Sequence, residues 1–454
     1  MKGVLIEGAR TNSLRHCRNL TVGGSADGTP VWTSPSQGSE LATNGTFGTG
    51  DLTNWLNLST GTGSATYSGG GCLLVGTDGN NRGIIGQAIT VSTSKSYLLS
   101  VECTSRTSGG FVISWGTAAD ASFQSTYIIA SATGTSTIVV KPTASTIYIK
   151  VITFFTGGNL VVDNISFKEC VVQANLNATG ICNQANSCTT LIAAANDATI
   201  LQQFTMASAA RSFSAYVKRK TGTGTISITR DGGSTWTDVT SQINSSTFTR
   251  VSILNTSVTN PNCGFKFGTS GDEIIVDCCQ DEAGVNVSTP IITTTATVTR
   301  NADVLTYPVA NVHATKNTVY HEAAASDTIA VDRRSFAVSA STNNRAQWLC
   351  HPGGSDKNLA RYGTGSATVA TGALNNTITN LTKSIMRWEN GSPGSAFANG
   401  TKLTDTGSNV SVTPTIIDIG LGNLGSSQLF GNVKNVRIWP NTLLTDAQCI
   451  QLTS

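Results

Sequence analysis

Flat aromatic side chains are the residues of this sequence whose chemistry points most directly to a ligand. The 454 residues include seven Trp and eight Tyr, and aromatic faces stack on the C–H surfaces of sugars. We identify four candidate carbohydrate-binding residues: Trp55, Trp115, Tyr127 and Trp348. Trp115 precedes Gly116 at the expected end of a strand, where its ring could be exposed, and Tyr127 follows a short loop later. Packing into a β core is the alternative for each ring.

Residues for catalysis or metal binding form no recognisable pattern. The sequence contains no Gly-x-Ser-x-Gly, His-Glu-x-x-His or phosphate-binding Gly-x-x-x-x-Gly-Lys, and its four His are widely spread. No spacing among the 26 acidic residues selects a catalytic carboxylate pair. We therefore expect no enzyme and no cofactor. Asp163 and Asp277, each after a Val-rich strand, could ligate a structural Ca²⁺ or accept backbone hydrogen bonds at a strand end.

The most specific short motif is Thr229-Arg-Asp-Gly-Gly-Ser-Thr-Trp236. It resembles the Asp-box of sialidases and related β-propellers, in which the motif is a hairpin turn away from the catalytic centre. A propeller needs several copies, whereas we find one. We therefore predict a structural turn in which Asp231 accepts hydrogen bonds and Trp236 covers the loop.

Composition excludes several classes of partner. Charged residues make up only 12% of the chain, and 29 basic and 26 acidic residues leave a net charge of +3, so nucleic acid is a poor default partner. No apolar run is long enough for a membrane span, and Glu7 and Arg10 interrupt the only apolar start, so we expect neither membrane insertion nor a secretory signal. The eleven Cys are expected to be reduced in β cores, with a surface disulfide between Cys182 and Cys188 as the alternative.

Short runs of β-branched and aromatic residues between Gly, Ser and Asn clusters predict an all-β fold of sandwiches. The runs after Thr90 and Thr205 have similar patterns about 115 residues apart, which predicts a tandem repeat of one sandwich. Tyr97 and Phe213 should then be equivalent and buried. A third unit follows, which includes an Asn399-Gly400 hairpin turn and a short terminal helix with Thr445 as its N-cap.

Two distant segments carry a resemblance to a known family. Bacteriophage tail and other virion proteins contain a segment that resembles Gly3-Val-Leu-Ile-Glu-Gly-Ala-Arg-Thr-Asn12. In those proteins a sandwich follows this segment, and its end is similar to Thr289-Pro-Ile291 through Thr299-Arg-Asn-Ala-Asp303 of this chain. Asn301 departs from the usual Ala. Asn44-Gly-Thr-Phe47 with Trp55 is similar to the opening of jelly-roll carbohydrate-binding modules, although Gly48 replaces a frequent acidic residue, and the segment from Phe397 onward looks like a concanavalin A or laminin-G-like domain.

The resemblance implies four regions. These are an extended N-terminal arm that serves as a virion anchor (1–38), a jelly-roll domain (39–171), a second jelly-roll domain with an extended connector (172–303), and a concanavalin-like sandwich (304–454). In the family the decapeptide leads directly into the sandwich that ends in the Arg-Asp stretch, so the first jelly roll looks like an insertion. Part of residues 14–38 is therefore expected to pack with the second jelly roll.

The function implied is that of a non-enzymatic bacteriophage virion protein, a tail fibre or capsid appendage. It would be assembled in the host cytoplasm, contact other virion proteins and itself, most simply as a homotrimer, and display domains that bind a host-surface glycan. The alternatives are a polysaccharide depolymerase with these modules as accessory domains, and a purely structural decoration protein. The candidate anchoring residues are an apolar patch and two charged neighbours that could pair: Val4, Leu5, Ile6, Glu7 and Arg10.

Overall fold

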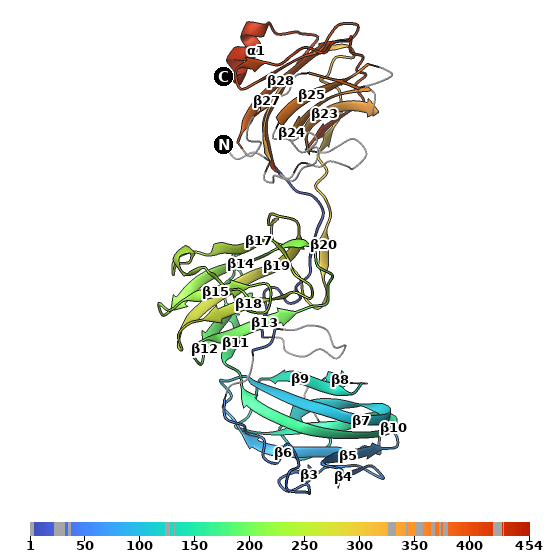
Figure 1. Ribbon diagram of the computed structural model, residues 1–454, viewed down its shortest axis with the longest axis vertical. Coiled ribbons are helices and arrows are strands. Elements are labelled where there is room, and N and C mark those ends of the chain that lie inside the picture. Colours follow the sequence, from blue (N-terminus) through green and yellow to red (C-terminus); the bar gives the residue numbers. More distant parts are fainter. Residues whose placement is uncertain are drawn as a thin grey trace. The chain divides into compact units, whose positions relative to one another are not determined.

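The computed structural model describes residues 4–21, 32–34, 38–122, 128–130, 132–325, 333–341, 344–350, 357–364, 368–371, 374–375, 380–420, 429 and 431–454. Within these residues the regular secondary structure is almost entirely β-strand, with one short 3₁₀ turn and one C-terminal helix (Figure 1). It divides into two compact units, Thr11–Val298 on one side and Met1–Arg10 with Thr299–Ser454 on the other. The predicted all-β fold of sandwiches is confirmed.

The first sandwich of the larger unit is built on two long strands that each take part in both of its sheets. Its strands are β3 (Leu56–Asn57), β4 (Ser64–Ser68), β5 (Gly71–Gly76), β6 (Ile84–Thr90), β7 (Tyr97–Gly116), β8 (Ile128–Ala130), β9 (Gly134–Val140) and β10 (Thr146–Glu169). The first part of β10 pairs with β6 and its later part with β5, while β7 runs beside it. Side chains from both layers form one apolar core.

The second sandwich has the same design with shorter strands. They are β11 (Val172–Ala178), β12 (Cys188–Ala193), β13 (Ala198–Gln203), β14 (Ala210–Thr221), β15 (Ile226–Thr229), β16 (Thr237–Asp238), β17 (Thr249–Ser257), β18 (Asn262–Phe267) and β19 (Glu273–Ala283). They form a five-stranded sheet in the order β11-β12-β19-β14-β17 and a four-stranded sheet in the order β13-β18-β15-β16.

Apart from β3, the strands of the two sandwiches have the same pairing order, which confirms the predicted repeat. The five-stranded order corresponds to β4-β5-β10-β7-β9 of the first sandwich, and the four-stranded order to β6-β10-β7-β8. The register agrees as well, since Asp163 lies opposite Glu102 and Asp277 lies opposite Tyr216 at the equivalent position. Tyr97 and Phe213 are both buried as predicted, but they are not equivalent. Phe213 lies opposite Asp281 as Leu99 lies opposite Phe167, so Phe213 matches Leu99, two residues after Tyr97. The long strands β7 and β10 of the first copy are thus each divided in two in the second copy.

The N-terminal segment is part of the second sandwich. Leu14, Cys17 and Leu20 belong to its apolar core together with Trp32, as expected for part of residues 14–38. The Asn12 amide donates to the carbonyl oxygens of Cys279 and Ile291, both at 2.9 Å, and its Oδ1 accepts from the backbone N–H of Asp281 at 3.1 Å. Residues 11–20 are therefore a structural element of this sandwich, which corrects the expectation of a separate arm over 1–38.

A buried carboxylate lies between two arginines beside this segment. Asp281 is fully buried, and its two oxygens lie 2.6 Å from the Nε atoms of Arg211 and Arg230. Arg211 also donates to the Ser13 hydroxyl at 2.6 Å, which connects the group to the N-terminal segment. Removing one member of such a group leaves uncompensated charge in the interior.

We predict that Asp281→Asn lowers the free energy of unfolding by about 3–5 kcal/mol, because two buried guanidinium groups lose their counter-charge. The matched control is Asp197→Asn, which removes a surface carboxylate paired with Lys266 and should cost less than about 1 kcal/mol. Urea unfolding of the full chain compares the two. Equal effects would contradict the importance given to Asp281.

The smaller unit is a third sandwich. Its strands are β1 (Val4–Ile6), β21 (Thr306–Tyr307), β22 (Lys316–Ala325), β23 (Arg333–Ser341), β24 (Asn344–Cys350), β25 (Lys357–Gly363), β26 (Thr368–Ala370), β27 (Leu374–Asn375), β28 (Thr382–Glu389), β29 (Ser395–Ala398), β30 (Thr401–Lys402), β31 (Ile416–Ile419) and β32 (Gly431–Pro440), followed by helix α1 (Asp446–Thr453). One sheet has the order β1-β32-β22-β28-β29-β30 and the other β21-β31-β23-β24-β25-β26, with β27 on β25. β2 (Arg10–Asn12) and β20 (Val298–Arg300), where the chain passes between the units, pair with each other.

The candidate anchoring patch is the edge strand β1 of this sandwich. Val4 lies opposite Val433, and Ile6 lies opposite Gly431. Ile6 and Glu7 are buried, whereas Leu5 on the other face of β1 is 39% exposed. Glu7 forms an ion pair of 3.4 Å with Arg300. Leu5 of this patch therefore reaches the surface, whereas Ile6 does not.

The core of the third sandwich contains a buried histidine. His321 Nε2 lies 2.9 Å from the Ser335 hydroxyl, and its ring contacts those of Phe336 and Trp348. Burial lowers the pKa of His321 to about 3, against an opposing effect of the Glu322 carboxylate. The folded protein therefore holds this imidazole neutral at pH values where the unfolded chain protonates it.

This pKa predicts a loss of stability in acid. Well above pH 6.5 the imidazole is neutral in both the folded and the unfolded state. As the pH falls from 6.5 toward 3, only the unfolded state takes up the proton. The free energy of unfolding therefore decreases by about 4–5 kcal/mol over that range. We expect His321→Gln to flatten this dependence, measured by urea unfolding at several pH values with tryptophan fluorescence. Parallel pH profiles for the variant and the native chain would contradict the prediction.

Candidate functional site

The structure corrects the predicted carbohydrate-binding residues. Trp115 is 4% exposed, Trp55 is 7% exposed, and Trp348 is completely buried. Trp55 and Trp115 belong to the core of the first sandwich and Trp348 to that of the third. Tyr127 lies outside the described residues. Trp115 is buried because side chains alternate along a strand, and Phe111, Ile113 and Trp115 share the inward face of β7.

The turn at Asp231 is held by hydrogen bonds to its carboxylate. Asp231 Oδ1 accepts from the Thr229 hydroxyl at 2.8 Å and from the Thr235 backbone N–H at 2.9 Å, and Oδ2 accepts from the Thr235 hydroxyl at 2.6 Å. Burial opposes ionisation, but these hydrogen bonds lower the pKa of Asp231 overall. Gly233 has a φ of +95°, and a Cβ there would lie 2.9 Å from the Trp236 ring. The motif is thus a closed turn, and both oxygens of its carboxylate accept hydrogen bonds from within the turn.

The two strand-end aspartates both accept backbone hydrogen bonds, one of the two roles that the sequence left open for them. Asp277 Oδ1 accepts from Arg18 Nε at 2.8 Å, and Oδ2 accepts from the Ile181 backbone N–H at 2.8 Å, so a guanidinium occupies the place of a cation. Asp163 accepts from the Asn164 backbone N–H at 2.7 Å. In the part of the chain that the structure describes, no group of three or more His, Cys, Asp or Glu is arranged to hold a metal.

The described cysteines are free thiols, including Cys182 and Cys188. Cys188 is buried while Cys182 is exposed, and burial raises the pKa of the Cys188 thiol to about 12. At neutral pH that thiol stays protonated and unreactive. The structure therefore has the reduced state that we expected and not the alternative disulfide.

The two segments that carry the resemblance to virion proteins contact each other. Asp303 Oδ2 accepts from the Glu7 backbone N–H at 2.8 Å, and the Asp303 backbone N–H donates to Glu7 O at 2.9 Å. Arg300 donates to Gly8 O at 3.0 Å and pairs with both carboxylates. We call Glu7, Gly8, Arg300 and Asp303 the N-terminal junction. In this junction Arg300 and Asp303, three residues apart, both contact Glu7, which lies almost 300 residues earlier in the sequence.

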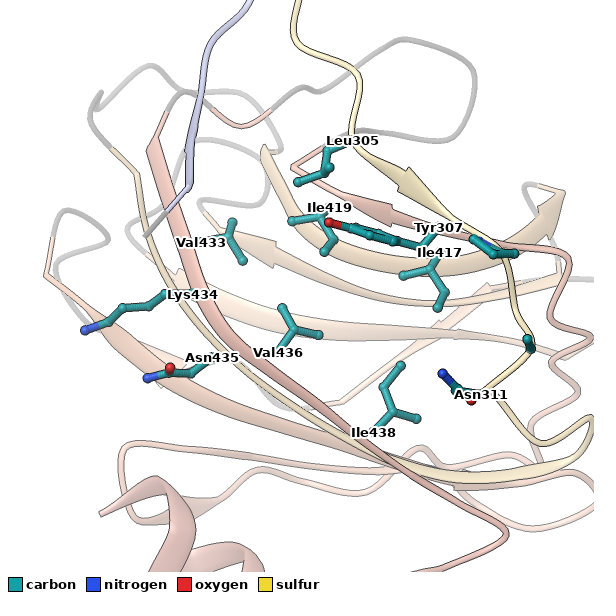
Figure 2. A pocket seen from close by; sticks show the side chains of 12 residues that line it. Leu305, Tyr307, Asn311, Ile417, Ile419, Val433, Lys434, Asn435, Val436 and Ile438 are labelled. Atoms are coloured by element: carbon teal, nitrogen blue, oxygen red, sulfur yellow. The ribbon is translucent and has the colours of Figure 1, made fainter. Parts of the chain in front are cut away.

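A pocket of about 450 Å³ opens at the edge of the third sandwich (Figure 2). We call it the edge pocket. Strands β21 and β31 and the loop after β21 contribute one wall, and β32 contributes the other. Its floor is aliphatic, and a few polar side chains stand at its rim. The floor consists of Leu305, Ile417, Ile419, Val433, Val436 and Ile438, and the polar side chains are Tyr307, Asn311, Lys434 and Asn435.

The polar wall of the edge pocket is held from the outer face of the sheet. Glu322 on β22 accepts from the Asn435 amide at 2.7 Å and from the Tyr320 hydroxyl at 2.8 Å, and it pairs with Lys434 at 3.2 Å. Burial opposes ionisation of Glu322, but these partners lower its pKa overall. Lys434 and Asn435 are therefore fixed beside the pocket, and Figure 2 shows both pointing away from the apolar side chains.

The edge pocket suits apolar side chains better than chemical catalysis. Its lining offers no carboxylate, His or Cys, and aliphatic surface gains free energy by excluding water from an apolar occupant. The apolar runs at residues 416–420 and 435–439 are typical of buried strands, but nothing local in the sequence indicates that two such strands lie at an open edge. Tyr307 is the single aromatic residue of the lining and is 47% exposed.

Comparisons with known proteins assign no family. No family model matches the chain, and no curated protein matches it. Among solved structures, domains LG4-5 of the mouse laminin alpha1 chain have a TM-score of 0.24 and 9% identity, covering 98% of this chain and 92% of that chain. The strand order, not this likeness, establishes the fold. Across the described residues, no helix has the length and hydropathy needed to span a membrane.

We predict that Trp115→Ala lowers the free energy of unfolding by about 3–5 kcal/mol, because it leaves a cavity in the first sandwich. Trp236→Ala, at a surface turn, is the control and should cost less. Denaturant unfolding of the full chain measures both. A Trp115→Ala protein of unchanged stability would show that the ring is not part of the core.

Proposed function

We propose that this protein is a non-enzymatic structural component of a bacteriophage virion, a tail fibre or capsid appendage, that presents β-sandwich domains to a glycan of the host surface. The observation that carries the proposal is the N-terminal junction. The segments that resemble virion proteins lie at opposite ends of 300 residues, yet Glu7, Arg300 and Asp303 form one connected set of hydrogen bonds and ion pairs. A chance resemblance of two short segments would not require them to meet.

The interlocked N-terminal segment also suits a component of a particle. It contributes β1 to one sandwich and Leu14, Cys17 and Leu20 to the core of another. Each part of this segment is held by packing within its own sandwich, and a terminal segment that is tied down in this way is less open to proteolysis than a free one. In our proposal the protein is assembled in the host cytoplasm and works in the virion.

We propose that the repeated sandwich domains bind the glycan, and that they do so without the four aromatic residues selected from the sequence. Weak sugar sites gain affinity when several are displayed together. Adsorption of the purified full chain to host cells tests this: mild periodate oxidation of the cell surface should abolish binding. Undiminished binding to oxidised cells would contradict a glycan receptor.

Incorporation into particles tests the virion assignment. The native chain should be found by mass spectrometry in density-purified particles of the phage that encodes it. Leu5→Glu places a charge on the exposed face of β1 and should reduce incorporation at least tenfold if that patch anchors the protein. Leu254→Glu is the matched control, since Leu254 is 47% exposed on β17 of the second sandwich and is not part of the patch.

Two results would count against this assignment. Absence of the native chain from purified particles would contradict the virion function itself, whereas normal incorporation of Leu5→Glu would contradict only the anchoring role of β1. The proposed homotrimer is tested separately, because sedimentation of the purified chain as a monomer at micromolar concentration would exclude it.

A further inference from the structure

Strand β32 has one edge that is only partly paired. On one side it pairs with β22 along its length, from Ala325 opposite Gly431 to Asn317 opposite Pro440. On the other side β1 pairs with it only from Gly431 to Val433. In the described part of the chain no strand lies beside residues 434–440 on that side. Unpaired strand edges are templates for an additional strand.

The backbone groups at this edge can be assigned from the ladder. The Asn441 N–H donates to Lys316 O at 2.9 Å, and hydrogen-bonding direction alternates along an antiparallel strand. The backbone groups of Arg437 and Trp439 therefore face β22, while those of Ile438 face the open edge. Pro440, which has no N–H, occupies a position where no ladder bond is lost.

The edge pocket lies beside the backbone groups of Ile438 that face this edge. Ile438 contributes to the edge through its backbone, and the side chains of Val436 and Ile438 both point into the pocket (Figure 2). Large apolar side chains on the opposite wall are also accessible, since Tyr307 and the neighbouring Val304 and Ile416 are exposed. An added strand could thus form backbone hydrogen bonds and bury alternate side chains at the same place.

Strand β1 shows what kind of segment this edge accepts. It is a Val-Leu-Ile strand from the other end of the chain, paired antiparallel with β32, and it buries alternate side chains such as Ile6 while leaving Leu5 outside. The open stretch continues the same edge of the same strand. Its exposed outer face carries Arg437, which lies 5.9 Å from the Tyr320 ring, so a carboxylate on an added strand would face a cation.

Of the features that usually protect edges, Pro440 removes one N–H donor at the far end of this edge, and the others lie at its β1 end. Lys434 is held by Glu322 across the face of the sheet. The irregularity in the ladder lies at Asn435 and Val436, between the pairings of Lys434 and Arg437, and Asn435 has a φ of +54°. These features lie at the β1 end of the stretch, and Arg437 to Pro440 pair with β22 in regular register.

We infer that the open edge of β32 and the edge pocket form a docking site for an extended segment of a partner protein, which adds as a strand and alternates aliphatic with acidic residues. The aliphatic side chains enter the pocket and the acidic side chains lie on the outer face near Arg437. This is a binding site beyond the proposed attachment function, and it does not depend on where the protein works.

The probe for this site is a fluorescein-labelled peptide, acetyl-Glu-Ile-Glu-Val-Glu-Ile-amide, titrated against the full chain by fluorescence anisotropy. The control peptide has the same sequence with N-methyl groups on two adjacent residues, which block both of its edges. We expect the control to bind at least tenfold more weakly. Ile438→Pro removes an edge N–H and should weaken peptide binding to the same degree, while Ile438→Val should bind normally; thermal melting verifies that both variants fold.

Each other outcome would overturn the inference. Equal binding of the two peptides would mean that the pocket takes side chains without strand addition. Unchanged binding to Ile438→Pro would place the peptide elsewhere. Absence of peptide binding to the native chain, together with dimers that Ile438→Pro dissociates in sedimentation, would assign the edge to a second copy of this chain. If Ile438→Pro does not fold, the comparison of the two peptides on the native chain still decides.

Discussion

The carboxylate of Asp281 is the interaction on which the arrangement of the larger unit depends. It lies in the interior of the second sandwich between Arg211 and Arg230, and its backbone N–H and C=O bond Asn12 and Ser13. Two buried guanidinium groups are tolerable only with a counter-charge and nearly complete hydrogen bonding. The N-terminal segment supplies part of that hydrogen bonding. The same group of side chains therefore stabilises this sandwich and fixes the path of residues 11–20 against it.

The repeat shows how one topology is realised in two ways. In the first copy, β7 continues through Gly109, which has a φ of +68°, and serves both sheets as one strand. In the second copy the chain leaves the sheet at the corresponding place, where Gly222 has a φ of +81° and packs against Asp272. Glycine relieves backbone strain at the point where the strand changes sheets in both copies. The division of the strand alters local structure while the order of pairing is kept.

Local signals in the sequence were sufficient for some features. Asn399 and Gly400 both have positive φ between β29 and β30, and Thr445 caps α1 in a capping box with Gln448. The repeat was also predictable, because alternation and spacing are preserved between its copies. These features depend on a few neighbouring residues, or on a pattern present twice, so no tertiary information was needed.

The exposure of the aromatic rings could not be predicted in the same way. Alternation identifies the inward face of a strand only when the other face is exposed to solvent. The last part of β7 is buried on both faces, since Val112 and Ser114 are buried like Ile113 and Trp115. A second small cluster, which includes Ile84, Val112 and Ile152, covers the outer face. The packing of residues 11–20 against β19 likewise joins segments some 270 residues apart, and nothing near Asn12 in the sequence specifies its partners.

Electron cryo-microscopy of intact particles tests the central claim most directly. The account predicts density in a tail fibre or capsid appendage that accommodates the two repeated sandwiches and the third sandwich, with the N-terminal strand β1 at a contact with another virion protein. A complete map of the particle in which no density fits these sandwiches would contradict it.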